Sequence, residues 1–332
     1  MTVKKPAFDV IAIGESLRDV FYMLHEASVS CSIHKERCLL CLEYAEKIPV
    51  THIVKVHAAG NSANAAVGSA RLGMKSALVS WVGKDAAGQE IQFALETEGV
   101  DQRFIVVDEK VATSEATILN FQGERTQLVH FEPRKYQLPA MPSTRCVYYS
   151  AMGSKHHAFD KMLLAELKKR PETLLAFQPG TTHVRSGLAA IKQLIRRSWV
   201  FILNKDEAHL LLPDGERTIH NLCENFHHLD AQIVIITDGE NGAVAFDGRT
   251  HWSMPIFPGK AFERTGAGDS FATAVTCALL QGKDLPEALR WGAANSWSVV
   301  KQIGPQAGLL TSAGMNTTLK KHAKVKASVV TV

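Results

Sequence analysis

The stretch ERTGAGDSF, residues 263–271, places three small residues directly before a carboxylate. Apolar residues follow at helical spacing until Gly282, so the acid stands at the start of a predicted helix. The first N–H groups of a helix lack intrahelical partners and favour anions, and glycine lets a phosphate approach the backbone closely. Asp269 therefore has two interpretations. It caps the helix, or it takes a proton from a substrate hydroxyl while neighbouring N–H groups hold a phosphoryl group.

Composition is ordinary for a globular protein. The 332 residues carry 46% hydrophobic and 21% charged side chains and a net charge of +4, which does not indicate a nucleic-acid partner. We expect the basic cluster at residues 320–326 to be a solvated tail. No apolar stretch approaches the roughly 20 residues that cross a bilayer, and the first apolar run predicts a strand rather than a signal peptide. We therefore expect a cytoplasmic location and reduced cysteines.

The cysteines leave one alternative open. Cys31, His34, Cys38 and Cys41 lie close together, and two of them have the C-x-x-C spacing of metal ligands. No second such pair follows in the sequence. We favour half-buried cysteines in a hairpin over a metal site.

Apolar runs alternate with helical patterns over most of the chain. This alternation predicts an α/β fold, a doubly wound and mostly parallel sheet with helices on both faces. The predicted strands are residues 8–14, 76–83, 145–153, 173–180, 199–204 and 232–239. The predicted helices are residues 61–73, 85–100, 158–169, 182–197, 205–212 and 216–228. Ligands of such sheets gather at the carboxyl ends of the strands.

Two regions interrupt the alternation, residues 20–57 and 112–131. Both contain extended runs of alternating apolar and polar residues, and the second has a turn at Gln122 and Gly123. Neither fits a strand–helix–strand unit. We interpret them as a small β-sheet that forms a lid on a single domain spanning residues 1–332.

Two common nucleotide-binding motifs are excluded. The stretch GSARLGMKS, residues 68–76, resembles a Walker A loop, but Met74 puts its lysine out of register, and the stretch leads from a helix into a strand. No G-x-G-x-x-G opens a strand–helix–strand unit, which argues against a dinucleotide-binding dehydrogenase.

Five motifs, taken together, resemble the ribokinase-like (phosphofructokinase B) family of carbohydrate kinases. They occur in the family's order and span nearly the whole chain. They are AGNSANAAVGSARLG (59–73), NKDE (204–207), TDGENG (237–242), ERTGAGDSF (263–271) and GPQAG (304–308). The resemblance implies the ribokinase-like fold with its β-sheet lid, and an ATP-dependent kinase that uses Mg²⁺.

The resemblance also implies catalytic roles. Asp269 corresponds to the base that takes the proton of the acceptor hydroxyl. The N–H groups of Gly266, Ala267 and Gly268 correspond to the anion hole for the transferred phosphoryl group.

For the acceptor, the resemblance implies Asp19, Gly60, Asn61 and Asn64. A carboxylate accepts two hydroxyl hydrogen bonds at once, which suits the diol of a sugar. The alternatives without a binding role are a surface acid at the end of a strand for Asp19 and an exposed helix position for Asn64.

For the nucleotide, it implies Asn204 and the turn at residues 237–242, which contains Thr237, Asp238, Gly239 and Gly242. Asn295, on the helix after the one that begins near Asp269, is expected either near the adenine or as a plain residue of the helix surface. Glu207 is expected to hold Mg²⁺ through water, although Asn204 and Glu207 also suit a helix cap. The residues that correspond to a monovalent-cation site, for potassium, are Glu263, Thr265 and Gly304.

The chain departs from the family pattern at three positions. Glu263 stands where the family usually has Asp, which puts potassium activation in doubt. Ala59 replaces the first glycine of a Gly-Gly pair, and Gln178 stands where an Asp or Asn often precedes proline.

Three functions stay open at this point. The first is phosphorylation of a sugar hydroxyl, and the second is a nucleoside kinase of the same fold. For the second, aromatic side chains in the lid would stack on the base. The candidates are Phe21, Tyr22, Phe121 and Phe131, although aromatics in hairpins more often serve simple packing. The third is a regulator that binds sugar or nucleotide with little turnover. Lid sheets of this family often pair between subunits, so a homodimer is also an expectation.

Overall fold

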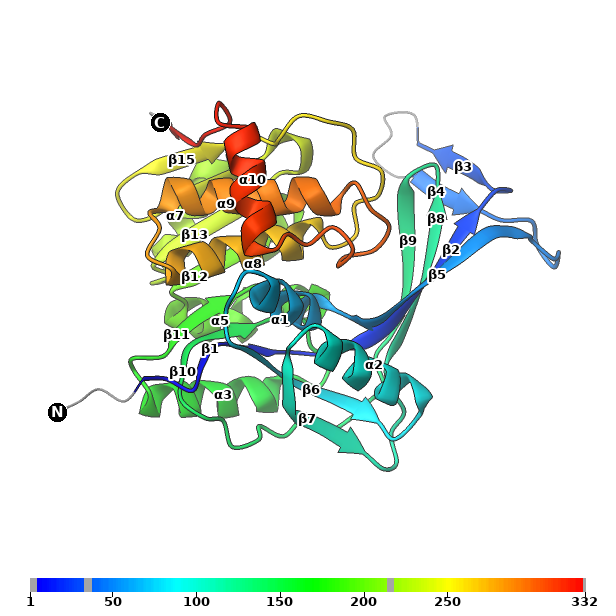
Figure 1. Cartoon of the computed structure of the whole chain (residues 1–332), viewed down its shortest axis with the longest axis horizontal. Coiled ribbons are helices and arrows are strands. Elements are labelled where there is room, and N and C mark those ends of the chain that lie inside the picture. Colours follow the sequence, from blue (N-terminus) through cyan, green and yellow to red (C-terminus); the bar gives the residue numbers. More distant parts are fainter. Residues whose placement is uncertain (1–4, 33–37, 214–217, 331–332) are drawn as a thin grey trace.

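The computed structural model describes residues 5–32, 38–213 and 218–330. Figure 1 shows a main body, built on a ten-stranded sheet, and a four-stranded lid that projects to the right. The strands of the main body are β1 (Phe8–Ile13), β6 (Ser76–Gly83), β7 (Asp101–Asp108), β10 (Thr144–Tyr149), β11 (Leu174–Phe177), β12 (Val200–Asn204), β13 (Ile233–Thr237), β14 (Ala243–Phe246), β15 (His251–Met254) and β16 (Ser328–Val330). Those of the lid are β2 (Leu17–Leu24), β5 (Val50–Ala59), β8 (Glu115–Phe121) and β9 (Glu124–His130).

Helices cover both faces of the large sheet. They are α1 (Asn61–Arg71), α2 (Ala86–Thr97), α3 (His157–Lys169), α4 (Thr181–Arg185), α5 (Leu188–Arg197), α6 (Lys205–Leu211), α7 (Ile219–His227), α8 (Ala267–Leu280), α9 (Leu285–Val299) and α10 (Ser312–Lys321). Alternate residues of β1 point to opposite faces, and both sets are buried. Val10 and Ala12 belong to the core cluster that includes residues of α1, α8 and α9, whereas Ile11 and Ile13 belong to the cluster that includes residues of α3, α5 and α7. A strand that is buried on both faces is typical of a parallel sheet, and the predicted doubly wound fold is confirmed.

The strand order is β16-β15-β14-β13-β12-β11-β10-β1-β6-β7. The strands from β13 to β7 pair in parallel, and β14, β15 and β16 extend one edge in antiparallel pairing. Neither β7 nor the antiparallel edge was among the predicted strands. The helix predicted over residues 182–197 is two helices, because Gly187 takes a left-handed conformation, with φ +82°, between α4 and α5. Residues 214–217, at the start of the predicted helix 216–228, lie outside the described residues.

The predicted lid is the sheet β5-β2-β8-β9, with Gln122 and Gly123 at the turn between β8 and β9. Its inward face is buried: Phe21 and Ile118 are 0% exposed and pack with Leu17, Ala59 and Ala116. This face lies toward the carboxyl ends of the strands, because β2 follows β1 and β5 leads into α1. The lid therefore covers the edge of the sheet at which ligands are expected.

Two cysteines are not the reduced thiols that we expected. Cys31 and Cys38 form a disulfide, with an S–S distance of 2.01 Å, across the exposed hairpin of β3 (Ser28–Cys31) and β4 (Cys38–Cys41). The two residues are direct cross-strand partners, which brings their sulfurs together. Of the open metal-site alternative, His34 lies outside the described residues, and the disulfide removes two of the three thiolate ligands. Among the described helices, none is long and apolar enough to cross a membrane.

Candidate active site

The loop before α8 is shaped by glycine and by contact with the loop of residues 304–308. Gly266 precedes α8 in the left-handed region, with φ +77°. A Cβ added there would lie 2.3 Å from Cβ of Pro305. Only glycine fits this close approach without displacing the second loop, so the TGAG sequence both makes the turn and holds the two loops together.

The N–H groups at the start of α8 are not equivalent. The N–H of Ala267 already donates to the carbonyl of Arg264 at 3.3 Å, and Gly266 packs against Pro305. Within the described chain, no acceptor is recorded for the N–H of Gly268, which is exposed and lines the main cleft. Among the described residues, no acceptor is recorded for the N–H of Gly266 either. The anion hole of three N–H groups stays a prediction, with Gly268 the donor best placed to meet an anion.

The Asp269 carboxylate is held between two neutral amides. Its Oδ2 accepts a hydrogen bond from Nδ2 of Asn64 at 2.8 Å, and its Oδ1 accepts one from Nε2 of Gln178 at 2.9 Å. Burial raises the pKa of Asp269, while these two hydrogen bonds act in the opposite direction. Asn64 is 3% exposed, so it is not the surface helix position of the alternative without a binding role. A fixed carboxylate with a raised pKa is suited to accept a proton.

The other predicted acceptor residues differ in their placement. Asp19, on β2, is 7% exposed, and burial together with the nearby Asp269 and Glu263 carboxylates raises its pKa to about 7. It is therefore not a surface acid. Gly60 has φ +98°, and an added Cβ would lie 2.6 Å from the carbonyl oxygen of Glu15. Asn61 is half-buried at the start of α1.

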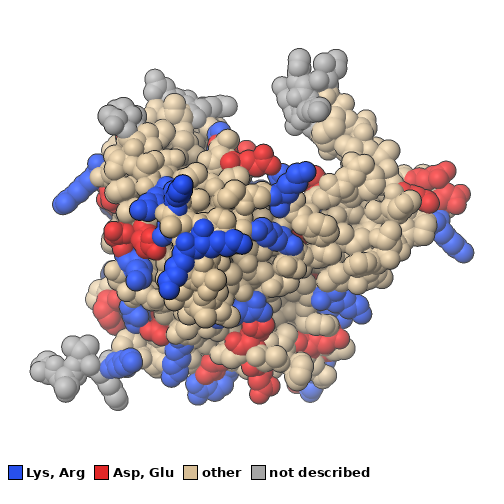
Figure 2. Space-filling model, turned by 45° about the horizontal axis from the view of Figure 1, so that its top comes forward, with Lys and Arg blue, Asp and Glu red and all other residues tan. Residues whose placement is uncertain are grey.

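A cleft of about 720 Å³ opens beside the start of α8. In Figure 2 the molecule is hollowed between the main body and the projecting lid. Arg125 of the lid, Asn204 of β12 and Gly268 of α8 all line the cleft. The cleft thus runs along the ends of the strands to the N–H groups of α8, and its size suits a small-molecule ligand.

One part of the cleft is lined by the predicted nucleotide turn. Thr237, Gly239 and Gly242 are in its wall. Asp238 is not among the lining residues: its carboxylate pairs with Lys205 at 3.0 Å and accepts from Asn241 at 3.2 Å. Asp238 therefore stabilises the turn from behind and does not line the cleft as predicted.

The opposite wall is apolar, and Asn295 is not part of it. Phe257, Phe271 and Trp297 supply flat apolar surface to the cleft. Asn295 is 0% exposed, donates to the carbonyl of Ser270 at 2.9 Å and accepts from the N–H of Leu310 at 2.9 Å. The prediction that Asn295 approaches adenine is wrong, because its amide ties α9 to α8 and to the chain before α10.

Asn204 and Glu207 form a helix cap, and Asn204 also lines the cleft. Asn204 Oδ1 accepts from the N–H of Glu207 at 2.8 Å, and Glu207 Oε2 accepts from the N–H of Asn204 at 2.9 Å. Burial and the Asp269 and Asp206 carboxylates raise the pKa of Glu207 to about 7. Neighbouring carboxylates that raise one another's pKa suit a divalent cation, and Oε1 of Glu207 has no recorded partner among the described residues.

The three residues of the expected monovalent-cation site lie together, but the carboxylate is occupied. Glu263 is 0% exposed, and its Oε1 accepts from the N–H of Thr265 at 2.7 Å and from its hydroxyl at 2.5 Å. Its Oε2 accepts from the N–H of Gly304 at 3.3 Å. Both oxygens of the Glu263 carboxylate thus already accept hydrogen bonds from within the chain, and potassium binding at these three residues stays a prediction.

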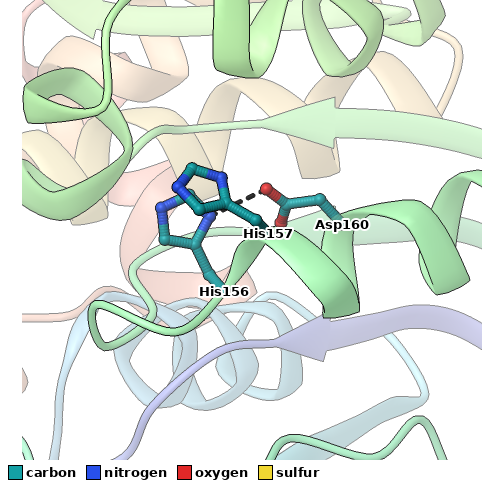
Figure 3. Close-up of side chains that lie close together, drawn as sticks. All are labelled: His156, His157 and Asp160. Carbon is teal, nitrogen blue, oxygen red and sulfur yellow. Dashed lines mark hydrogen bonds and ion pairs between the residues drawn. The ribbon is translucent and has the colours of Figure 1, made fainter.

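A separate histidine cluster lies on α3 and in the turn before it. Figure 3 shows His156, His157 and Asp160, whose potential ligand atoms lie within 4.8 Å of one another. Asp160 is already bonded to His156 Nδ1 at 2.8 Å and accepts from the Tyr149 hydroxyl at 2.5 Å. His156, Asp160 and Tyr149 form a buried hydrogen-bond network, whereas His157 is exposed, and none of the four lines the main cleft.

Several site residues were missed by the sequence reasoning. Gln178 was noted only as a departure from the family pattern. Gln306 was noted only as part of the loop at residues 304–308, yet Nε2 of Gln306 donates to Oδ1 of Asn64 at 3.0 Å. Arg125 and Trp297 line the cleft but carry no local motif. A polar residue at the end of a predicted strand was the one available signal, and it applied to Gln178.

Several known proteins are similar to this chain. The family described as "pfkB family carbohydrate kinase" matches residues 26–312. A 5-dehydro-2-deoxygluconokinase of Bacillus subtilis (strain 168) is 25% identical over 331 residues, which cover 93% of this chain and 95% of the relative.

Solved structures of similar fold include two kinases. The nucleoside kinase of Methanocaldococcus jannaschii has a TM-score of 0.75 and 22% identity, with 96% of this chain and 100% of that chain covered. The ribokinase of Arabidopsis thaliana, complexed with ribose and ATP, has a TM-score of 0.77 and 19% identity, with 95% and 99% covered.

Proposed function

The chain belongs to the pfkB family of carbohydrate kinases, and from this premise we propose that it is an ATP-dependent phosphotransferase acting on a hydroxyl of a small sugar. The observation that carries the proposal is the position of Asp269. Its carboxylate is held by Asn64 and Gln178 next to Gly268, whose N–H has no recorded acceptor in the described chain and which lines a cleft of about 720 Å³. An acid and a free N–H are thus adjacent at one helix start, as the reaction requires.

In the proposed reaction, Asp269 takes the proton of the acceptor hydroxyl as its oxygen attacks the γ-phosphorus of ATP. The new P–O bond forms, the bond from the γ-phosphorus to the bridging oxygen breaks, and ADP leaves. The N–H of Gly268 stabilises negative charge on the phosphoryl group in transit. The carboxylate of Asp269 contacts the acceptor hydroxyl, whereas the N–H of Gly268 contacts the phosphoryl group. The negative carboxylate and the positive N–H therefore act on different atoms of the substrates.

Asp19 is proposed to bind sugar hydroxyls, with Gly60 allowing close approach and Asn61 completing the pocket. The turn at residues 237–242 and the wall around Trp297 would line the nucleotide. Glu207 would hold Mg²⁺ through water, and the ion would neutralise phosphate charge. We include no potassium in the proposal, because the Glu263 carboxylate is already occupied.

The nucleoside-kinase alternative loses one of its four candidate stacking residues, while Tyr22, Phe121 and Phe131 are half-buried and stay candidates. Phe21, one of the candidate stacking residues, is fully buried in the lid and packs toward Gly304. It is therefore not free to stack on a base. The regulator alternative requires that the intact Asp269 and Gly268 be unused.

A single assay separates the three functions. ADP release would be measured with a panel of sugars, sugar acids, sugar phosphates and nucleosides, each with ATP and Mg²⁺. We expect turnover with a sugar-derived acceptor. Turnover with nucleosides alone would favour the second function, and ligand binding without any turnover would favour the regulator.

We further propose that residues 1–332 form a single kinase domain. We also propose that the protein is a homodimer whose two copies pair through their lids. The outward face of the lid carries exposed apolar side chains, including Ile53 at 51% and Leu128 at 57%. Exposed apolar surface of this kind marks an interface. The molar mass in solution, measured by light scattering for wild type and for Ile53→Lys with Leu128→Lys, would test it: a monomeric wild type would contradict the dimer.

A cytoplasmic location also belongs to the proposal, because a kinase needs a supply of ATP. The Cys31–Cys38 disulfide is an observation against this location, because disulfides are uncommon in reducing compartments. Fractionation of cells, with detection of the untagged protein, would decide.

A further inference from the structure

Gln178 contacts Asp269 at the end of β11. The backbone of Gln178 is anchored on both sides: its N–H donates to the carbonyl of Tyr149 at 3.0 Å, and its own carbonyl accepts from the hydroxyl of Ser150 at 2.8 Å. These bonds fix the point from which the side chain reaches Oδ1 of Asp269 at 2.9 Å.

The orientation of the Gln178 amide is determined by a second contact. Its Oε1 accepts a hydrogen bond from the hydroxyl of Tyr148. Tyr148 is 1% exposed, and burial raises the pKa of its hydroxyl well above the usual value, so it stays a donor. Because the amide oxygen is engaged by Tyr148, the amide NH₂ must face Asp269.

The Asn64 amide on the other side of Asp269 is oriented in the same manner. Its Oδ1 accepts from Nε2 of Gln306 at 3.0 Å while its Nδ2 faces Asp269. Each carboxylate oxygen of Asp269 thus receives one hydrogen bond from a neutral amide whose direction is fixed by a further donor. Each oxygen keeps a lone pair for a substrate proton.

Acidic side chains already lie around Asp269, and a neutral residue at position 178 adds no further negative charge to them. Asp19 of β2 and Glu207 of α6 are close enough to interact with the Asp269 carboxylate, and Glu263 acts on Asp19. Arg125 of β9, in the lid, is the cation whose charge lowers the pKa of the Asp269 carboxylate. A further acid in direct contact with Asp269 would share its proton.

We propose that Gln178 is a positioning residue for Asp269: the Tyr148–Gln178 pair holds the base in its reactive orientation and keeps it ionised without adding a charge. This inference rests on the proposed function, because it assumes that Asp269 is the base. It assigns a role to one of the three positions at which the chain departs from the family pattern.

The test is the pH dependence of kcat/KM, with the acceptor identified in the panel, for wild type, Gln178→Glu and Gln178→Leu. Gln178→Glu should move the acid limb upward by about one pH unit or more, with activity partly recovered at high pH. Gln178→Leu should lower kcat by about tenfold, with little change in the KM for ATP. Gln89→Glu, at an exposed position of α2, is the matched control and should keep the wild-type profile.

Tyr148→Phe is a second variant that tests the inference if the Gln178 variants fail to fold. It keeps Gln178 but removes the donor that orients it, and it should lower kcat while ATP still binds. A Gln178→Glu enzyme with the wild-type profile and kcat would overturn the inference. If wild type turns over no acceptor of the panel, the proposed function fails instead, and if Asp269→Asn keeps full activity, Asp269 is not the base. The failures are therefore distinguishable.

Discussion

Nδ2 of Asn64 lies 2.8 Å from Oδ2 of Asp269, although the two residues are 205 positions apart in the sequence. The contact joins the starts of α1 and α8, which pack against each other on one face of the large sheet. Two helix starts therefore converge on one carboxylate. This convergence connects the acceptor side of the site with its phosphate side.

The Asn64 contact should matter for turnover more than for folding. Asn64→Ala removes the hydrogen bond to Asp269, so we expect kcat/KM for the acceptor to fall by about tenfold or more. Asn316→Ala, an exposed position on α10, is the control and should behave as wild type. Steady-state kinetics with thermal unfolding of both variants checks this; equal kinetics for Asn64→Ala would contradict the role.

Two glycines, one before α8 and one after it, form a matched pair. Gly266 and Gly282 have φ +77° and +78°, but only Gly266 has a neighbour, Pro305, in the way of a Cβ. Gly282→Ala should cost about 1–2 kcal/mol from backbone strain alone and leave kcat unchanged. Gly266→Ala should cost more and also lower kcat, because the loop that precedes Gly268 must shift. Urea unfolding and kinetics of both variants would show it, and equal effects would exclude the Pro305 contact as the cause.

Asp19 should make stability depend on pH. Its pKa is raised to about 7 from an ordinary value near 4, so between about pH 4 and 7 the folded state binds more protons at this group than the unfolded state. The contribution of Asp19 to the free energy of unfolding therefore falls as pH rises through this window.

Asp19→Asn removes this contribution. Without ligand, the free energy of unfolding of the variant relative to wild type should increase with pH, by up to about 1.4 kcal/mol per pH unit. Urea titrations at several pH values measure the difference. A difference that is constant or decreases from pH 4 to 7 would contradict the burial of an acidic Asp19.

The choice of monovalent cation should not matter. The carboxylate of Glu263 is occupied by Thr265 and Gly304, so we expect the same initial rate in potassium, sodium and choline chloride at equal ionic strength. A marked acceleration by potassium alone would show that this donor set rearranges to bind the ion.

Local patterns predicted the parts of the site that begin a helix or end a strand. The TGAG sequence, the Asn204–Glu207 cap and the small-residue helix at Asn64 carry their signal within a few residues. Contacts between distant segments carry none. Gln178 and Asp269 are 91 positions apart, and nothing near either residue indicates that they meet.

The wrong predictions have related causes. The helix α9 is buried on several sides, so spacing alone did not show that Asn295 faces α8 rather than the cleft. The short strands β14 and β15, of four residues each, are too brief for an alternation pattern. The Cys31–Cys38 disulfide depends on the pairing register of β3 and β4, which the spacing of the cysteines does not determine.

The central claim is that Asp269 removes the proton of the acceptor hydroxyl. Asp269→Asn keeps the size of the side chain and removes the base, so the direct measurement is kcat together with ATP affinity, the latter by calorimetry. We predict a loss in kcat of about 10²–10⁴-fold, with ATP affinity within a few-fold of wild type. A variant that retains most of its kcat would contradict the claim.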